Sequence, residues 1–167
     1  QLSMKLHLAA GLAALAITNP VNAQGTLHLG GKATLANNAV IQAVLETGAI
    51  NVVKDDPTEC KDPSLGGAFI TYGPNIKPVL LICMKNAETY AELADTIRHE
   101  AYHAVSWCRG GSLFTWEKNI ELAHPYDIGM VYKYYEPKQW NDELEARSAA
   151  RYLTDSDIAE QVNKYCM

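Results

Sequence analysis

The chain has 167 residues, a length that fits one domain with a substantial hydrophobic core. Hydrophobic residues make up 48 % of it, which excludes an intrinsically disordered chain. The formal net charge of −5 provides no basic surface, so nucleic-acid binding is not expected.

The first 23 residues have the pattern of a secretory signal peptide. Lys5, just after a candidate start at Met4, precedes an apolar run over residues 8–17, and Ala23 is the expected cleavage position. The run is too short to cross a bilayer, although a retained anchor or a buried helix is the alternative. We therefore expect a mature single domain of residues 24–167 that is secreted or periplasmic and makes no membrane contact after cleavage.

The N-terminal half of the mature chain is predicted to form a helix followed by strands. A helix is expected over residues 33–46, with Gly48 ending it. Residues 50–53 form a short apolar run that suits a strand. Segments 68–72 and 79–84 suit two more strands, and the glycine and prolines between them predict a β-hairpin.

A long helix is expected over residues 87–108, with Asn86 as its N-cap and Gly110 just after its end. Apolar side chains at helical spacing form its core stripe. The stripe consists of Tyr90, Leu93, Ala94, Ile97, Ala101, Ala104, Val105 and Cys108. His99 and His103 lie at the edge of this stripe or opposite it, where a cleft can form.

The C-terminal third is predicted to be a loop region followed by two helices. Residues 112–138 contain many aromatic side chains, which either form one wall of a cleft or pack over the core. Residues 139–153 suit a helix, and Asp155 or Ser156 is expected to cap a last helix ending at Cys166. The predicted fold class is α+β and mostly helical, with a β-hairpin beside the long helix.

Four cysteines, all in the mature part, are expected to form two disulfides, because export favours disulfides and the count is even. A four-cysteine zinc site is disfavoured since no close Cys-x-x-Cys pair exists. Of the three possible pairings we predict Cys60–Cys83, which joins the loop before the hairpin to its second strand. The other pair is then Cys108–Cys166, which joins the end of the long helix to the C-terminal helix.

The long helix contains the pattern His-Glu-x-x-His at His99, Glu100 and His103. Residues four apart share one face of a helix, so the two imidazoles can bind one metal ion. Glu100 lies about 100° further round, close enough to hold a metal-bound water and take its proton. The pattern predicts a zinc site with a general base. The alternative is a helix with two unrelated histidines and a solvated glutamate.

A catalytic zinc site normally has three protein ligands, so a third ligand is needed. The candidates are Glu143, Glu145, His124 and Glu121. Glu143 and Glu145 lie about 200° apart on a helix, so only one can face the metal. Ala146 and Ala150 on the Glu143 side allow close helix packing, whereas the neighbours of Glu145 are more solvent-like. His124 is the runner-up, and a solvated Glu143 paired with Arg147 is the alternative.

The segments His99-Glu100-x-x-His103 and Glu143-x-x-Ala146 resemble those of the gluzincin type of zinc metallopeptidase. The resemblance implies a minimal zincin-like domain, a zinc cofactor and Glu143 as the third ligand. Many gluzincins carry Asp at the position of Arg147, which leaves the partner of a ligand histidine open. The sequences of these segments also resemble those of small uncharacterised exported proteins of cyanobacteria and their phages.

The leading hypothesis is a zinc metallopeptidase that hydrolyses a peptide or protein substrate, with zinc-bound water activated by Glu100. Tyr102, or a tyrosine between residues 126 and 135, is expected to stabilise the oxyanion. Alternatives are a non-catalytic zinc-binding secreted domain of the same fold and a metal-free secreted binding domain. Cleavage preference and oligomeric state are left open.

Overall fold

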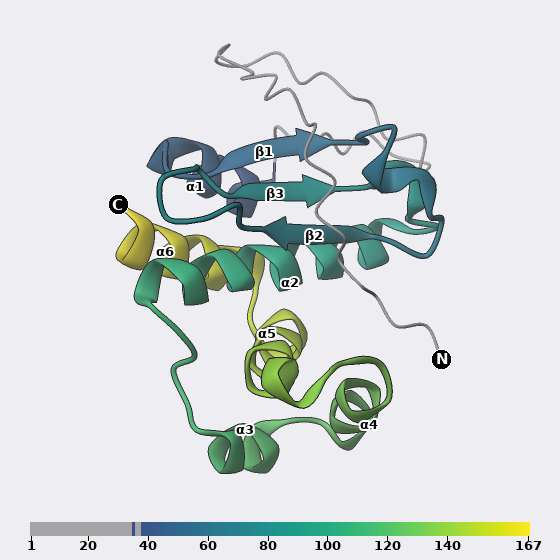
Figure 1. The fold of residues 1–167 in the computed structure, drawn as a ribbon, viewed down its shortest axis with the longest axis vertical. Helices are drawn as coiled ribbons and strands as arrows, with labels where there is room; N and C mark the ends of the chain where they lie inside the picture. The colour runs from purple at the N-terminus through teal and green to yellow at the C-terminus, as the bar shows by residue number, and fades with distance from the viewer. Residues whose placement is uncertain (1–34, 36–37) are drawn as a thin grey trace.

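The computed structural model describes Leu35 and residues 38–167, and the predicted signal peptide lies outside them. Within this part there are six α-helices and one three-stranded sheet, which confirms the α+β, mostly helical class (Figure 1). None of the helices described is both long and apolar enough to cross a membrane.

Helix α1 spans Ala39–Thr47, a shorter element than the helix predicted from residue 33. Its N-cap is Asn38, whose side-chain oxygen accepts hydrogen bonds from the backbone amides of Val40 and Ile41. Gly48 ends the helix in the left-handed conformation, as predicted, with a φ of 62°.

The sheet consists of β1 (Asn51–Lys54), β2 (Gly67–Ile70) and β3 (Val79–Ile82) in the order β1-β3-β2. Strands β2 and β3 pair antiparallel, which confirms the predicted hairpin. Strand β1 pairs parallel with β3, a non-local pairing that the sequence pattern did not indicate. Strand β3 is therefore central and carries the buried residues Leu80, Leu81 and Ile82, whereas β2 is an edge strand.

Helix α2 spans Tyr90–Arg109 and carries the His-Glu-x-x-His pattern. Thr89 caps it, and the side chain of Glu92 accepts a hydrogen bond from the Thr89 backbone amide, which completes a capping box. Gly110 ends the helix in the left-handed conformation, as predicted. The predicted cap Asn86 has another role, because Thr89 stands closer to the first helical turn.

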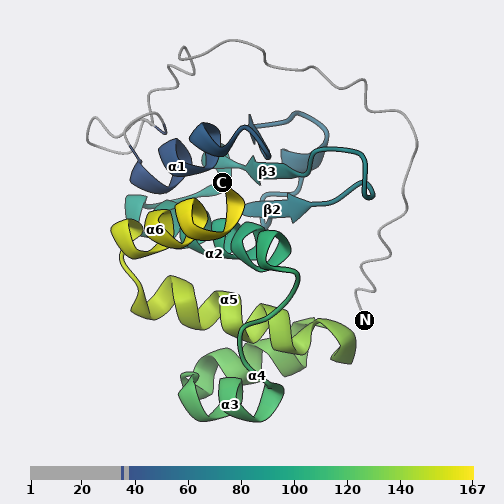
Figure 2. The ribbon, with the colours of Figure 1, turned by 90° about the vertical axis from the view of Figure 1, so that its left-hand side faces the viewer.

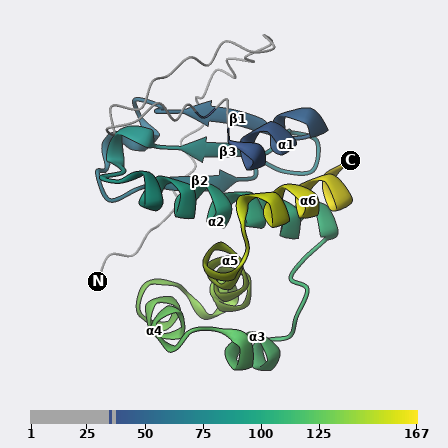
Figure 3. The same cartoon turned by 180° about the vertical axis from the view of Figure 1, so that it is seen from behind.

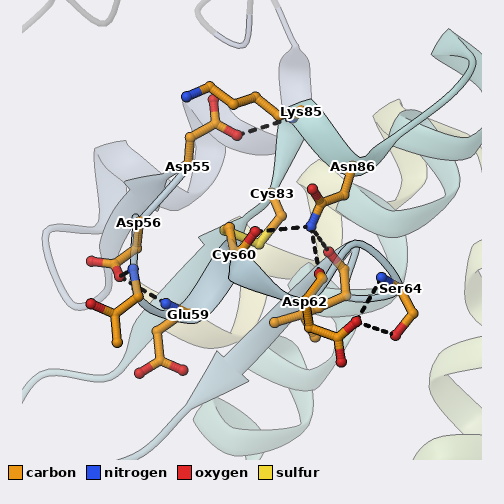
Figure 4. The surroundings of a disulfide bond; sticks show 11 residues. Asp55, Asp56, Glu59, Cys60, Asp62, Ser64, Cys83, Lys85 and Asn86 are labelled. Atoms are coloured by element: carbon orange, nitrogen blue, oxygen red, sulfur yellow. Dashed lines mark hydrogen bonds between the residues drawn. A yellow bond between two sulfur atoms is a disulfide. The ribbon is translucent and has the colours of Figure 1, made fainter.

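The side chain of Asn86 binds the loop that precedes the hairpin (Figure 4). Its amide nitrogen donates to the carbonyl oxygens of Asp62 and Leu65, both at 2.8 Å, and to that of Cys60 at 3.3 Å. The disulfide Cys60–Cys83 closes the same loop, and this pairing was predicted. The loop is thus fixed by one covalent bond and one side-chain amide.

Residues 112–138, predicted as a loop region, instead contain α3 (Trp116–Leu122) and α4 (Pro125–Tyr134). The oxygen of Thr115 caps α3 and a ring nitrogen of His124 caps α4, with Pro125 in the first helical turn. A small aromatic cluster joins these helices to the next one, with Tyr132 lying edge-on to both Trp116 and Trp140.

The last two helices are α5 (Trp140–Tyr152) and α6 (Asp155–Cys166). Both were predicted, but the cap of α6 is Thr154 and not Asp155 or Ser156, because the Thr154 hydroxyl accepts from the Asp157 amide. The disulfide Cys108–Cys166 joins the end of α2 to the end of α6, which confirms the second predicted pairing.

Helix α2 lies between two layers of the molecule (Figures 1 and 3). The sheet covers one side of α2, α6 lies alongside it, and α5 crosses its other side (Figure 2). Helices α3 and α4 lie beyond α5. Most of the predicted core stripe of α2 is buried, although Tyr90 is exposed. Because α2 is covered on two sides, His99 and His103, which lie off that stripe, are also largely enclosed, and they approach Glu143 of α5.

Candidate metal centre

His99 and His103 lie on the side of α2 that faces α5, with their side chains 14 % and 10 % exposed. Their Nε2 atoms are 3.2 Å apart, so both rings point at one position. One ligand atom of Glu100 completes the group, and the three atoms lie within 4.8 Å of one another. This group of residues could hold a metal ion.

Glu143 approaches the same two imidazoles from α5. Its Oε2 lies 3.4 Å from Nε2 of His99, and its Oε1 lies 3.6 Å from Nε2 of His103. The predicted proximity of Glu143 to both histidines is therefore confirmed. The alternative pairing with Arg147 is not observed, because the Arg147 guanidinium donates to the Tyr135 hydroxyl instead.

The spacing of these atoms fits a tetrahedral ion. Ligands bound at about 2.0–2.1 Å in tetrahedral geometry are separated by about 3.4 Å. The two Nε2 atoms are 3.2 Å apart, and the nearest Glu143 oxygen is 3.4 Å from one of them and 3.6 Å from the other, a different oxygen in each case, so the separations are of this size. Oε2 of Glu143 is also buried and accepts no hydrogen bond from any residue that the structure describes. A buried carboxylate oxygen without a donor is well placed to bind a cation.

The charges around the histidine pair favour a cation. Burial acts to raise the pKa of Glu143, but the close approach and the charges of His103 and His99 outweigh burial and lower this pKa to about 2. Burial acts to lower the pKa of His103, but the carboxylates of Asp142, Glu143 and Glu100 outweigh it and raise the pKa to about 10. A metal ion here competes with a proton for the same carboxylate-rich position.

Asp142 orients one of the imidazoles. Its Oδ2 lies 2.9 Å from Nδ1 of His103, so Nδ1 carries a hydrogen, and Nε2 is the nitrogen at which a metal would replace a proton. Many gluzincins carry an aspartate at the position of Arg147, so the sequence left the carboxylate partner of the histidines unassigned. In the structure, Asp142 is the carboxylate that contacts His103. The sequence analysis did not assign it, although an acidic residue directly before the favoured ligand was an available signal.

Glu145 faces a different side of α5 and is 3 % exposed. Its oxygens accept hydrogen bonds from the Tyr102 hydroxyl at 3.0 Å, Nη2 of Arg109 at 2.7 Å and the Leu113 amide at 2.8 Å. The expectation of solvent-like surroundings for Glu145 is therefore wrong, because the C-terminal end of α2 and the following loop cover it. Tyr102, fixed in this network, is not available to stabilise an oxyanion.

The remaining candidate ligands have structural positions of their own. His124 is exposed, and its Nδ1 accepts a hydrogen bond from the Tyr126 amide at the start of α4. The side chain of Glu121 is 67 % exposed and pairs with Lys118. Neither lies beside the histidine pair in this structure, which favours Glu143 over the runner-up His124.

No protein-family model, no curated protein and no solved structure matches this chain. The gluzincin resemblance therefore rests on the motif residues and their geometry alone.

Strand β2 approaches Glu100 very closely at Gly67. A Cβ atom on Gly67 would lie 2.7 Å from the backbone oxygen of Leu81, 3.0 Å from Cγ2 of Thr96 and 3.1 Å from Cγ of Glu100. Only glycine allows this approach. The edge strand of the sheet consequently runs directly beside the candidate general base.

Proposed function

We propose that the protein is a zinc-dependent metallopeptidase that acts in a secreted or periplasmic location. The observation that carries the proposal is the buried Oε2 of Glu143, which has no hydrogen-bond donor within the described part of the chain and lies 3.4 Å from Nε2 of His99. Two imidazoles and one glutamate are a known ligand set of catalytic zinc, whereas calcium and magnesium favour oxygen ligands throughout. His99, His103 and Glu143 would hold the zinc.

Each residue of the site then has a role in hydrolysis. Zinc bound there would polarise the scissile carbonyl and lower the pKa of a water molecule to about 7. Glu100, whose carboxylate lies beside the histidine pair, takes a proton from the attacking water and passes it to the leaving amine. Asp142 keeps the Nε2 lone pair of His103 directed at the metal.

Two further features support a peptide substrate and an extracytoplasmic location. The free edge of β2 beside Glu100 offers backbone hydrogen-bonding groups to an extended peptide. The two disulfides suit an oxidising compartment, as expected for an exported protein.

Metal analysis and peptide hydrolysis by the purified mature protein test the proposal. We expect one zinc per chain in the parent, none in His99→Ala and full zinc in His124→Ala, which removes an exposed imidazole. Glu100→Gln should keep zinc and lose activity, since a base is removed but no ligand. Glu160→Gln, which neutralises an exposed glutamate on α6, should change neither.

Activity that survives Glu100→Gln would contradict the hydrolytic role of Glu100. A parent protein that binds zinc through His99 but cleaves nothing in a broad peptide library would instead be a non-catalytic zinc-binding domain. A chain that takes up no zinc would overturn both readings of the site.

A further inference from the structure

A pocket of about 310 Å³ lies next to the candidate metal centre, where α2 and α5 cross. This volume is at the lower end of the range of about 300–1,000 Å³ that is usual for ligand sites. His99 forms part of the wall, so the pocket adjoins a proposed metal ligand. The charged side chains that line it are Arg98, Arg147, Arg151, Asp95 and Asp127. Three arginines against two aspartates leave one positive charge in excess.

Two of the three guanidinium groups are bound to carboxylates of the protein. Arg151 forms a two-fold contact with Asp127, with Nε and Nη2 at 2.6 and 2.9 Å from its oxygens. Arg98 donates from Nη1 to Asp155 at 3.0 Å and from Nε to the backbone oxygen of Ala150 at 2.9 Å. These two arginines hold α2, α4, α5 and α6 together and retain little capacity for a ligand.

Arg147 differs from both of them. Among the residues that the structure describes, no carboxylate lies within ion-pair distance of its guanidinium. Nη2 donates to the Tyr135 hydroxyl at 3.4 Å, and the group lies 5.7 Å from the centre of the Tyr135 ring. Its Nε is buried and has no hydrogen-bond partner among these residues. A half-buried cation at a pocket wall, with no carboxylate partner among the described residues, is suited to an anionic ligand.

The position of Arg147 along α5 indicates how far a bound anion would lie from the proposed metal ligand Glu143. Arg147 follows Glu143 by four residues, which is about 6 Å along a helix axis. One residue of an extended peptide spans about 3.3–3.6 Å. This span is somewhat less than two such residues, so a carboxylate bound at Arg147 would belong to one of the two residues nearest a peptide bond positioned at the metal.

From this geometry we propose that Arg147 binds a carboxylate of the substrate, carried by one of the two residues nearest the scissile bond. This inference rests on the proposed hydrolytic function of the same site. The planar guanidinium fork matches the two oxygens of a carboxylate. Either a free C-terminal carboxylate or the side chain of Asp or Glu would supply this chemistry, and the experiment separates these two sources.

Equilibrium binding to the zinc-loaded Glu100→Gln protein provides a readout without turnover. The probes are acetyl-tetra-alanine as the free acid and as the C-terminal amide. Amidated tetrapeptides with one glutamate, or one glutamine, at each position form the second series. We expect the free acid, or one glutamate peptide, to bind at least about tenfold more tightly than its neutral counterpart. The first result indicates a C-terminal carboxylate and the second an acidic side chain.

Adding Arg147→Gln should abolish this preference and leave the affinity for the neutral probes unchanged. Arg147→Lys keeps the positive charge but lacks the planar guanidinium, so it should retain part of the preference. It also provides a second test if the glutamine variant does not fold. Lys138→Gln removes a cation whose side chain is 79 % exposed and should have no effect. Circular dichroism and zinc content confirm that each variant is folded and loaded.

A carboxylate preference that persists in both Arg147 variants, or equal binding of charged and neutral probes, overturns the inference. The parent protein separates this failure from a failure of the proposed function. If the parent hydrolyses charged and neutral substrates with equal kcat/KM, the proposed peptidase function stands and the proposed carboxylate site is wrong. If binding shows an Arg147-dependent preference but no peptide is hydrolysed, the carboxylate site stands and the proposed peptidase function is wrong.

Discussion

Glu143 and Glu145 lie two residues apart on α5, but their surroundings differ, and alanine variants of the two should separate their roles. Glu145 is 3 % exposed and accepts hydrogen bonds from Tyr102, Arg109 and Leu113. Replacing Glu145 with alanine leaves the Arg109 guanidinium, in a side chain that is 11 % exposed, without its only carboxylate partner among the described residues. We expect this variant to be strongly destabilised.

The magnitude follows from the contacts that are lost and those that remain. Removing one partner of a buried ion pair costs about 3–5 kcal/mol. Arg109 keeps its hydrogen bond from Nε to the backbone oxygen of Gly111 at 3.0 Å and its position over the Tyr165 ring. These contacts favour the lower end, about 3 kcal/mol of unfolding free energy. Combining Glu145→Ala with Arg109→Met should recover at least about 1 kcal/mol, since no buried charge is then left unpaired.

Urea unfolding followed by circular dichroism measures these changes, with the disulfides intact and zinc removed by a chelator. Glu143→Ala is the matched control, because the imidazoles of His99 and His103 that it leaves without this carboxylate can lose a proton, whereas the Arg109 guanidinium cannot. It should abolish zinc binding and cost less unfolding free energy than Glu145→Ala. A loss below about 1 kcal/mol for Glu145→Ala would refute the reasoning, as would an equal loss for the two variants.

Three further predictions follow from single features of the structure. Asp142→Asn should lower zinc affinity about tenfold, at the low end of the usual range because its side chain is 47 % exposed, in competition with a chromophoric chelator. Cys108→Ala with Cys166→Ala should cost about 4 kcal/mol of unfolding free energy, since the bond closes a loop of 58 residues. Gly67→Ala should cost about 1–3 kcal/mol and lower any peptidase activity, because its Cβ meets a strand carbonyl oxygen at 2.7 Å. Gly129→Ala, with no atom within 4 Å of its Cβ, is the control.

The parts of the site that follow from local geometry could be predicted from sequence. The spacing of His99 and His103 places both on one face of any helix, whatever surrounds it. Glu143 required a second helix to pack closely, and the buried Ala146 and Ala150 on its side of α5 indicated this contact. The even number of cysteines predicted two disulfides, whereas their pairing was a choice among three possibilities that the structure confirms.

The remaining features depend on how α5 crosses α2, which no periodic pattern specifies. That crossing turns Asp142 toward His103 and Glu145 toward Arg109. The two helices between residues 112 and 138 were missed for another reason. In α3 only Asn119 is buried, and in α4 only Asp127 and Val131, so neither helix has an apolar stripe. Their capping residues were the only local signals, and the aromatic side chains obscured them.

Every cysteine of the chain is in a disulfide, and the proposed metal ligands are nitrogen and oxygen atoms only. The reactivity of the site is therefore independent of the thiol–disulfide balance around it. A reductant would weaken the attachment of α6 to α2 but would remove no ligand, and peroxide would find no thiolate at the metal. The redox state of the compartment thus affects the stability of the fold through the disulfides, and it leaves the metal ligands chemically unchanged.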